Sequence, residues 1–160
     1  MKKIWPFAGV LVCIAALSFI LFNTQGHTKT SLKCKAFSRA TVDIENGALV
    51  FSVVENLQLY NNKDGMIQYE GYVKSPKENT YLERTVYLSE GVKVDKETYT
   101  FKINKIVPSP LDTTPDEIFN QMWLEITSDN QSVTLSFKKI KDNMYLVNGP
   151  YSPQFTCVGY

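Results

Sequence analysis

Residues 47–60 read GALVFSVVENLQLY, and apolar side chains recur at alternate positions along them. Successive side chains of a β-strand point to opposite faces, so this alternation predicts a strand with one buried face. Asn46-Gly47 is a turn signal just before the strand. The alternating apolar positions are Leu49, Phe51, Val53, Leu57 and Leu59.

Segments of the same kind follow along the chain, separated by Gly, Asn and Asp turns. They cover residues 67–74, 81–88, 99–104 and 133–138, with short final strands at 144–147 and 154–158. Tyr69, Tyr99 and Phe101 fall on the apolar faces of their strands, and a barrel of such strands can be filled by side chains or hold one small ligand. We therefore expect a mainly β (α+β) domain, with an antiparallel sheet curled into a barrel or sandwich.

One helix is expected within this series. Residues 114–117, Thr-Pro-Asp-Glu, have the form of a capping box with Pro at the first helical position. Four apolar side chains then share one helical face: Ile118, Phe119, Met122 and Ile126. The pattern predicts a helix over residues 115–124 that covers an open end or edge of the sheet. The stripe is explained by core packing, and a partner groove is the alternative.

The N-terminus carries a long apolar run. Residues 4–22 contain no charge and follow Lys2 and Lys3; as a helix they would span roughly 28 Å, close to the hydrocarbon core of a bilayer. Residues 16–18, Ala-Leu-Ser, offer a signal-peptide cleavage site, but cutting there would leave an apolar N-terminus. We therefore expect residues 1–3 in the cytoplasm, 4–22 as an uncleaved transmembrane anchor, 23–32 as a linker and 33–160 as a periplasmic β-rich domain. Lysines flank both sides of the run, so they leave the orientation open.

The cysteines bear on that orientation. Cys13 lies within the apolar run, whereas Cys34 and Cys157 stand near the two ends of the soluble part. A Cys34–Cys157 disulfide would close a very long loop and stabilise the domain by about 5 kcal/mol in the chain-entropy model. Such a bond persists only in an oxidising compartment, which favours the periplasm. Two buried free thiols in a cytosolic domain are the alternative.

Catalytic signals are nearly absent. His27 is the only histidine and lies in the linker, so the domain has no Ser-His or Cys-His arrangement. Setting aside Lys2 and Lys3, the net charge falls from +1 to −1, which gives no reason to expect direct nucleic-acid binding. Residues 130–132, Asn-Gln-Ser, match a glycosylation sequon that only a eukaryotic secretory route would use. We expect no enzymatic activity, no metal site and no cofactor.

The layout resembles a known group of proteins. The resemblance rests on residues 1–5 with the span that follows, 33–35, 113–117 and 155–157. In these the chain is similar to the small inner-membrane partners of ToxR-like regulators: the ToxS, FidL-like and PsaF/MyfF-type proteins, the last being accessory regulators of fimbrial genes. The resemblance implies a non-enzymatic protein that binds the periplasmic domain of a membrane-spanning transcription factor. It also implies a lipocalin-like barrel that can take up a small amphiphile with the partner, but it carries over no binding residue.

We therefore expect a single-pass bacterial inner-membrane protein that stabilises or activates a ToxR-like regulator, with a link to fimbrial or virulence genes. A heterodimer on the periplasmic side would form through a sheet edge or the barrel rim. The rival interpretation is a stand-alone periplasmic ligand-binding or inhibitor module.

Overall fold

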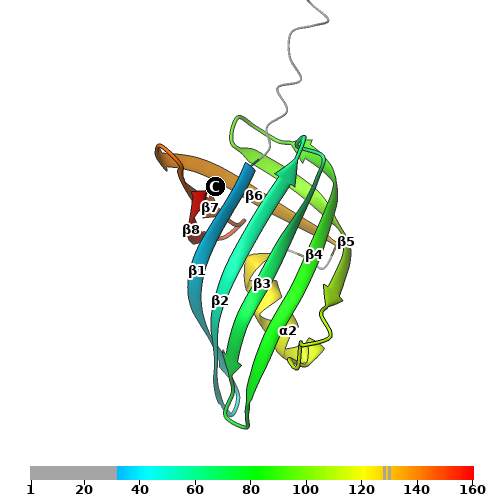
Figure 1. Ribbon diagram of the computed structural model, residues 1–160, viewed down its shortest axis with the longest axis vertical. Helices are drawn as coiled ribbons and strands as arrows, with labels where there is room; N and C mark the ends of the chain where they lie inside the picture. The colour runs from blue at the N-terminus through cyan, green and yellow to red at the C-terminus, as the bar shows by residue number, and fades with distance from the viewer. Residues whose placement is uncertain (1–31, 128, 130) are drawn as a thin grey trace, which may run out of the picture.

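The described part of the chain forms an antiparallel barrel. The computed structural model describes residues 32–127, 129 and 131–160, and in it each strand pairs with the next and β8 returns to β1 (Figure 1). The mainly β class and the barrel are confirmed, and the sandwich alternative is not. The elements are β1 Leu32–Ile44, β2 Gly47–Tyr60, β3 Asp64–Lys74, β4 Asn79–Lys93, β5 Thr98–Pro108, α2 Asp116–Ile126, β6 Ser132–Lys141, β7 Met144–Asn148 and β8 Pro153–Gly159.

Some expectations fall outside the described residues. These are the anchor at 4–22 with Cys13, the linker up to residue 31 with His27, and Asn130 of the sequon. Within the described part, no helix combines the length and the apolar character needed to cross a membrane. Leu32, the last residue of the expected linker, is already the first residue of β1.

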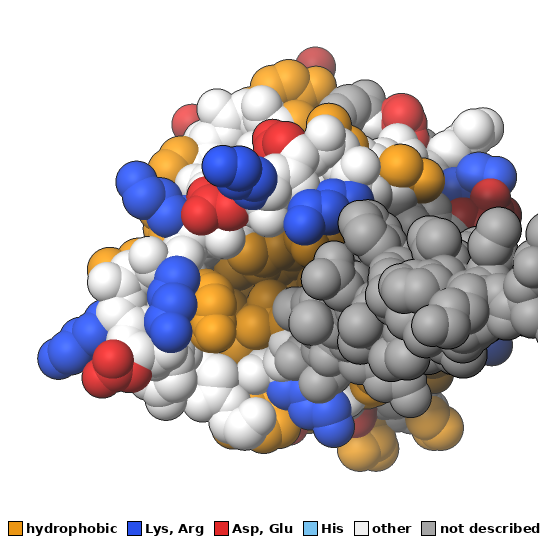
Figure 2. All heavy atoms as spheres, turned by 90° about the horizontal axis from the view of Figure 1, so that it is seen from above, with side chains coloured by type: hydrophobic (Ala, Val, Ile, Leu, Met, Phe, Trp, Pro, Cys, Tyr) orange, Lys and Arg blue, Asp and Glu red, His pale blue; other side chains and the backbone are white. Residues whose placement is uncertain are grey.

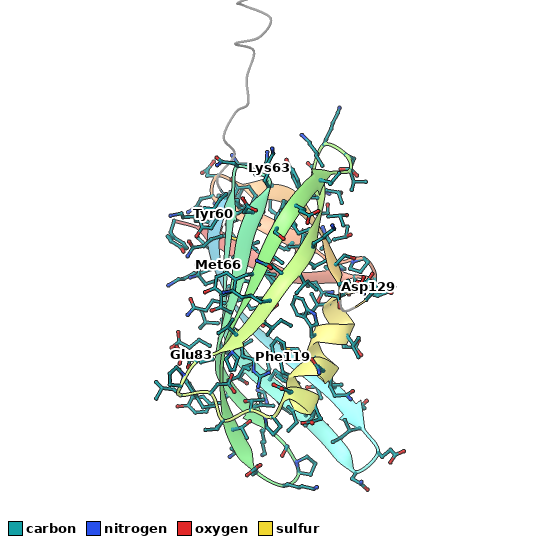
Figure 3. All side chains as sticks on the ribbon, turned by 90° about the vertical axis from the view of Figure 1, so that its right-hand side faces the viewer. Tyr60, Lys63, Met66, Glu83, Phe119 and Asp129 are labelled. Atoms are coloured by element: carbon teal, nitrogen blue, oxygen red, sulfur yellow. A yellow bond between two sulfur atoms is a disulfide. The ribbon has the colours of Figure 1, made fainter. Side chains whose placement is uncertain are left out.

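The barrel is uneven around its circumference. The first four strands have 11 to 15 residues and pair along most of their length, whereas β7 and β8 have five and seven. Helix α2 lies in the half of the barrel that the long strands reach and the short ones do not (Figure 1). Its Phe119 faces the strands (Figure 3), and the Tyr69 ring of β3 meets the rings of Phe119 and Trp123 edge-on, at 6.0 and 6.3 Å between centroids. The helix therefore completes the core where the sheet wall is missing.

The interior is packed with side chains. Tyr69, Phe51, Phe101, Phe119 and Trp123 are all at most 1% exposed. They include two of the three aromatic residues expected on the apolar faces, and the third, Tyr99, is buried at 9% exposure. The barrel is thus filled through its middle.

The predicted capping box is wrong. The helix begins at Asp116, its N-cap is Pro115, and no side chain caps it. The Thr114 hydroxyl instead lies 3.0 Å from the Tyr81 carbonyl oxygen and 3.0 Å from the Thr80 hydroxyl, both on β4. The Thr114 hydroxyl therefore makes tertiary contacts with β4 and does not cap the helix as the local sequence pattern predicted.

Arg84 of β4 attaches the start of the helix to the sheet. Its Nε lies 3.0 Å from an Asp112 carboxylate oxygen and its Nη1 lies 2.6 Å from Asp116. The second terminal nitrogen donates to the Thr114 carbonyl oxygen. Because Arg84 and Asp112 are both buried, this pairing fixes the loop before α2 against β4.

The expected disulfide is present. Cys34 of β1 and Cys157 of β8 are bonded, with their Cα atoms 5.4 Å apart and both side chains fully buried. The bond joins the first strand to the last at the end of the barrel where β1 begins.

Candidate functional site

The barrel closes through only two residue pairs between its first and last strands. β8 pairs with β1 at Cys34↔Gly159 and Lys35↔Val158, and β1 then continues to Ile44. In the described part of the chain, residues 36–44 have β2 as their only strand partner. We call residues 36–44 the free edge of β1.

The orientation of the free backbone groups follows from the hairpin. A two-residue turn joins Ile44 to Gly47, and the pair that flanks such a turn exchanges hydrogen bonds. Even-numbered residues of β1 therefore bond to β2, and odd-numbered residues direct their N–H and C=O groups away from it. The bond from Tyr160 N to the Lys33 carbonyl oxygen, 3.2 Å, agrees with this assignment. Phe37, Arg39 and Thr41 consequently offer unpaired backbone groups, the usual template for an added strand.

A groove runs beside the free edge. It has a volume of about 290 Å³ and lies between β1, α2 and the segment that leads into β8. Residues 38–42 line it from β1, and Met122, Glu125 and Ile126 line it from α2. The free edge therefore borders an open space with a mixed polar and apolar lining.

A buried carboxyl group also lines this groove. Glu55 of β2 is 5% exposed, and it lies on the inner face between Val53 and Leu57. The Ser38 hydroxyl donates to Glu55 Oε1 at 2.5 Å, and Oε2 has no hydrogen-bond partner among the described residues. Burial raises the pKa of Glu55 to about 7, against the lowering effect of the Ser38 hydrogen bond.

Within the described part of the chain, two more buried polar atoms have no hydrogen-bond partner. They are the Tyr69 hydroxyl and Trp123 Nε1. Tyr69 pairs directly with Glu55 across β2 and β3, and the Trp123 ring contacts Tyr69. Burial, and then the nearby Glu55, raise the pKa of Tyr69 well above its ordinary value. The protein interior here contains unmet hydrogen-bonding capacity, which is uncommon in folded proteins.

The end of the barrel where β1 begins has a separate hollow. Viewed from that end, Figure 2 shows hydrophobic side chains inside the hollow and basic side chains around it. Its volume is about 210 Å³. Leu32, Leu59, Tyr99, Phe137 and Tyr145 supply the apolar lining, with Asn62, Lys96 and Glu97 beside them.

The sequence pointed to the disulfide and to no ligand residue. The groove and Glu55 were missed, although a signal was present: Glu55 occupies an apolar-face position in the alternation of residues 47–60. Among the described residues, no group of three or more His, Cys, Asp or Glu is placed to hold a metal ion.

The comparisons with known proteins give a family. The family model described as "FidL-like putative membrane protein" matches residues 71–157, more than half of the chain. The chain belongs to the FidL-like family. The matched region of this FidL-like protein runs from the middle of β3 to Cys157 and includes α2, whereas the free edge and Glu55 precede it. A comparison with curated proteins gives no match.

Proposed function

We propose that this FidL-like protein is a non-enzymatic, membrane-anchored periplasmic partner that stabilises or activates a membrane-spanning transcriptional regulator. The observation that carries the proposal is the free edge of β1 beside an open groove. In this proposal, a strand of the regulator pairs with residues 36–44.

Backbone chemistry supports strand addition at this place. The free groups of Phe37, Arg39 and Thr41 would gain partners, while the groove would receive alternate side chains of the added strand. On the outer face, Phe37 is 72% exposed and its cross-strand neighbour Val54 is 39% exposed, so an added strand would also cover apolar surface. Backbone pairing with apolar contacts predicts an association that tolerates salt.

The family and the disulfide support the remaining parts of the proposal. The FidL-like family is described as membrane proteins, in agreement with the uncharged residues 4–22. The Cys34–Cys157 bond is of the kind that persists in the periplasm. Anchoring both partners in one membrane would raise their effective concentration for each other.

The experiment blocks the free edge without breaking the barrel. Thr41→Pro removes an N–H that points away from β2, which an edge strand tolerates. Full-length protein is purified in detergent from membranes of its host, and co-purifying proteins are identified by mass spectrometry. We expect wild type and Thr41→Ala to bring down a membrane-spanning protein with a DNA-binding domain, and Thr41→Pro to lose most of it.

A second proline tests the backbone orientation itself. Val42→Pro removes an N–H that bonds to β2, so it should lower the free energy of unfolding by about 1–3 kcal/mol, whereas Thr41→Pro should change it far less. Retention of the regulator by a folded Thr41→Pro protein would contradict binding at the free edge. Full restoration of target transcription by a version that lacks residues 33–160 would contradict the whole proposal.

The apolar hollow favours a second candidate function, a stand-alone periplasmic ligand-binding or inhibitor module. Leu59, Tyr99 and Phe137 could hold the apolar part of a small amphiphile, with Lys96 beside it. In that case no regulator should co-purify, and deleting the gene should leave transcription unchanged.

A further inference from the structure

Glu55 differs from the buried ion pair of the described part, Arg84 with Asp112. Arg84 has Asp112 and Asp116 as partners, whereas Glu55 has only the Ser38 hydroxyl. A buried carboxylate that lacks a positively charged partner is costly, because the interior does not replace its hydration. Glu55 Oε2 therefore lacks a hydrogen-bond donor in the described part of the chain.

The described residues do not supply that donor. Their ion pairs involve Arg84 and Lys102, and neither one reaches Glu55. Arg39 lines the groove, but it is exposed and makes no ion pair there. With about 290 Å³, the groove is far larger than the roughly 30 Å³ that one water molecule occupies in the liquid.

We propose that this groove receives a lysine or arginine side chain from the strand that adds to β1, and that its cationic nitrogen donates to Glu55 Oε2. The inference rests on the proposed function, because the side chain comes from the regulator's strand. It adds the chemistry by which the site would select that strand.

The distance across the sheet favours a long side chain. Glu55 is level with Ala36 of β1, and the added strand would lie one strand farther out. Two strand spacings amount to about 9–10 Å, which Lys or Arg can bridge toward a glutamate and Ser or Asn cannot. The inward-facing residues of β1 at this level, Ala36 and Ser38, have small side chains, and Ser38 lines the groove.

The groove lining holds more acidic than basic side chains, Glu55 and Glu125 against the exposed Arg39. Glu125 of α2 is a second acid in the lining and is exposed at the surface. An entering carboxylate would meet both acids, whereas an ammonium or guanidinium group would be attracted by both. Tyr69, the cross-strand neighbour of Glu55, adds a hydroxyl group that has no hydrogen-bond partner among the described residues.

The experiment uses full-length protein in detergent and three dye-labelled peptides of ten residues. Each has alternating Thr and Val, and the position that would lie level with Ala36, close to one end of the peptide, is Lys, norleucine or Glu. Binding is measured by fluorescence anisotropy. We expect the Lys peptide to bind about tenfold more tightly than the norleucine peptide, and the Glu peptide to bind most weakly.

Two variants assign the preference. Glu55→Gln keeps the shape of the side chain but removes its charge, and it should make the Lys and norleucine peptides equal. Glu78→Gln also replaces a carboxylate by an amide, at an exposed position outside the groove lining, and it should leave the tenfold ratio intact.

The outcomes separate this inference from the proposed function. Equal binding of the Lys and norleucine peptides to wild type would contradict the pairing of a cationic side chain with Glu55, but it would remain consistent with strand addition at the free edge. A preference for the Lys peptide that remains in Glu55→Gln would also contradict the pairing of the cationic side chain with Glu55. If no peptide binds, both strand addition at the free edge and the pairing of a cation with Glu55 are contradicted.

Discussion

At the scale of single residues, Glu55 departs most from what its surroundings favour. It takes an inward position between Val53 and Leu57, where the strand pattern calls for an apolar side chain. Its cost to folding depends on pH, because the folded state holds its proton more tightly than the unfolded chain does.

The first prediction concerns this pH dependence. Below pH 4.5 Glu55 is protonated in both states and costs little. As the pH rises from 4.5 through about 7, the unfolded chain loses the proton first, so stability is lost. Glu55→Gln should remove this loss, and its advantage in unfolding free energy over wild type should grow by about 3 kcal/mol between pH 4 and pH 8.

Urea unfolding at several pH values, followed by fluorescence, measures that difference. Glu78→Gln is the control and should stay within about 0.5 kcal/mol of wild type throughout. A Glu55→Gln advantage that does not change with pH would show that the carboxyl group is hydrated in the folded protein.

At the scale of secondary-structure elements, α2 replaces a missing part of the barrel wall. Phe119, Met122, Trp123 and Ile126 are buried against the sheet, and Leu124 is 49% exposed. The helix thus depends on a narrow set of side chains for its attachment, together with Arg84 at its start.

The second prediction compares two neighbouring helix residues. Trp123→Ala should lower the free energy of unfolding by about 3–5 kcal/mol, because it empties a fully buried position between α2 and Tyr69. Leu124→Ala, on the outer side of the same helix, should cost much less. Thermal and urea unfolding of the two variants measures the contrast. Equal losses would mean that α2 packs in another orientation.

The elements themselves were largely predictable from the sequence. Two-residue alternation located β2 to β6, and the short strands 144–147 and 154–158 correspond to β7 and β8. The helix was found, but its capping box was wrong because Thr114 bonds to β4, which the local sequence does not reveal. Trp123 was missed because the expected stripe, Ile118 with Phe119, Met122 and Ile126, was centred slightly to one side of the buried face.

The candidate site was much less predictable than the strands. The free edge exists because β8 is short and meets β1 at only two residue pairs. The two strands of this pairing come from opposite ends of the domain, and the sequence of neither strand shows where the pairing ends. Glu55 was visible as a polar residue on an apolar face, but its unpartnered oxygen depends on Ser38, Tyr69 and α2 being folded around it.

At the scale of the whole molecule, one covalent bond holds the two ends of the domain together. Cys34 and Cys157 are separated by 123 residues in sequence, and the β1–β8 pairing beside them is short. Backbone pairing alone gives this junction little strength.

The third prediction concerns the bond. Replacing Cys34 and Cys157 by Ala should lower the free energy of unfolding by about 2–5 kcal/mol, because the unfolded chain regains the freedom of a long loop. Urea unfolding measures the loss, and Cys13→Ala serves as the control without effect. Peptide mapping without reductant should link the Cys34 and Cys157 peptides. Recovery of both thiols in alkylated form from native protein would contradict the bond.

The β1–β8 junction at the disulfide also limits the length of any segment that pairs with β1. The pairing of β8 with Cys34 and Lys35 ends the free edge on one side, and the turn after Ile44 ends it on the other. Between these limits the free edge has nine residues, which correspond to about 30 Å of extended chain. A longer segment must bulge or leave the barrel at the open end, so contact length, and with it the strength of backbone pairing, has a fixed upper limit. Selectivity would then come from side chains rather than from a longer strand.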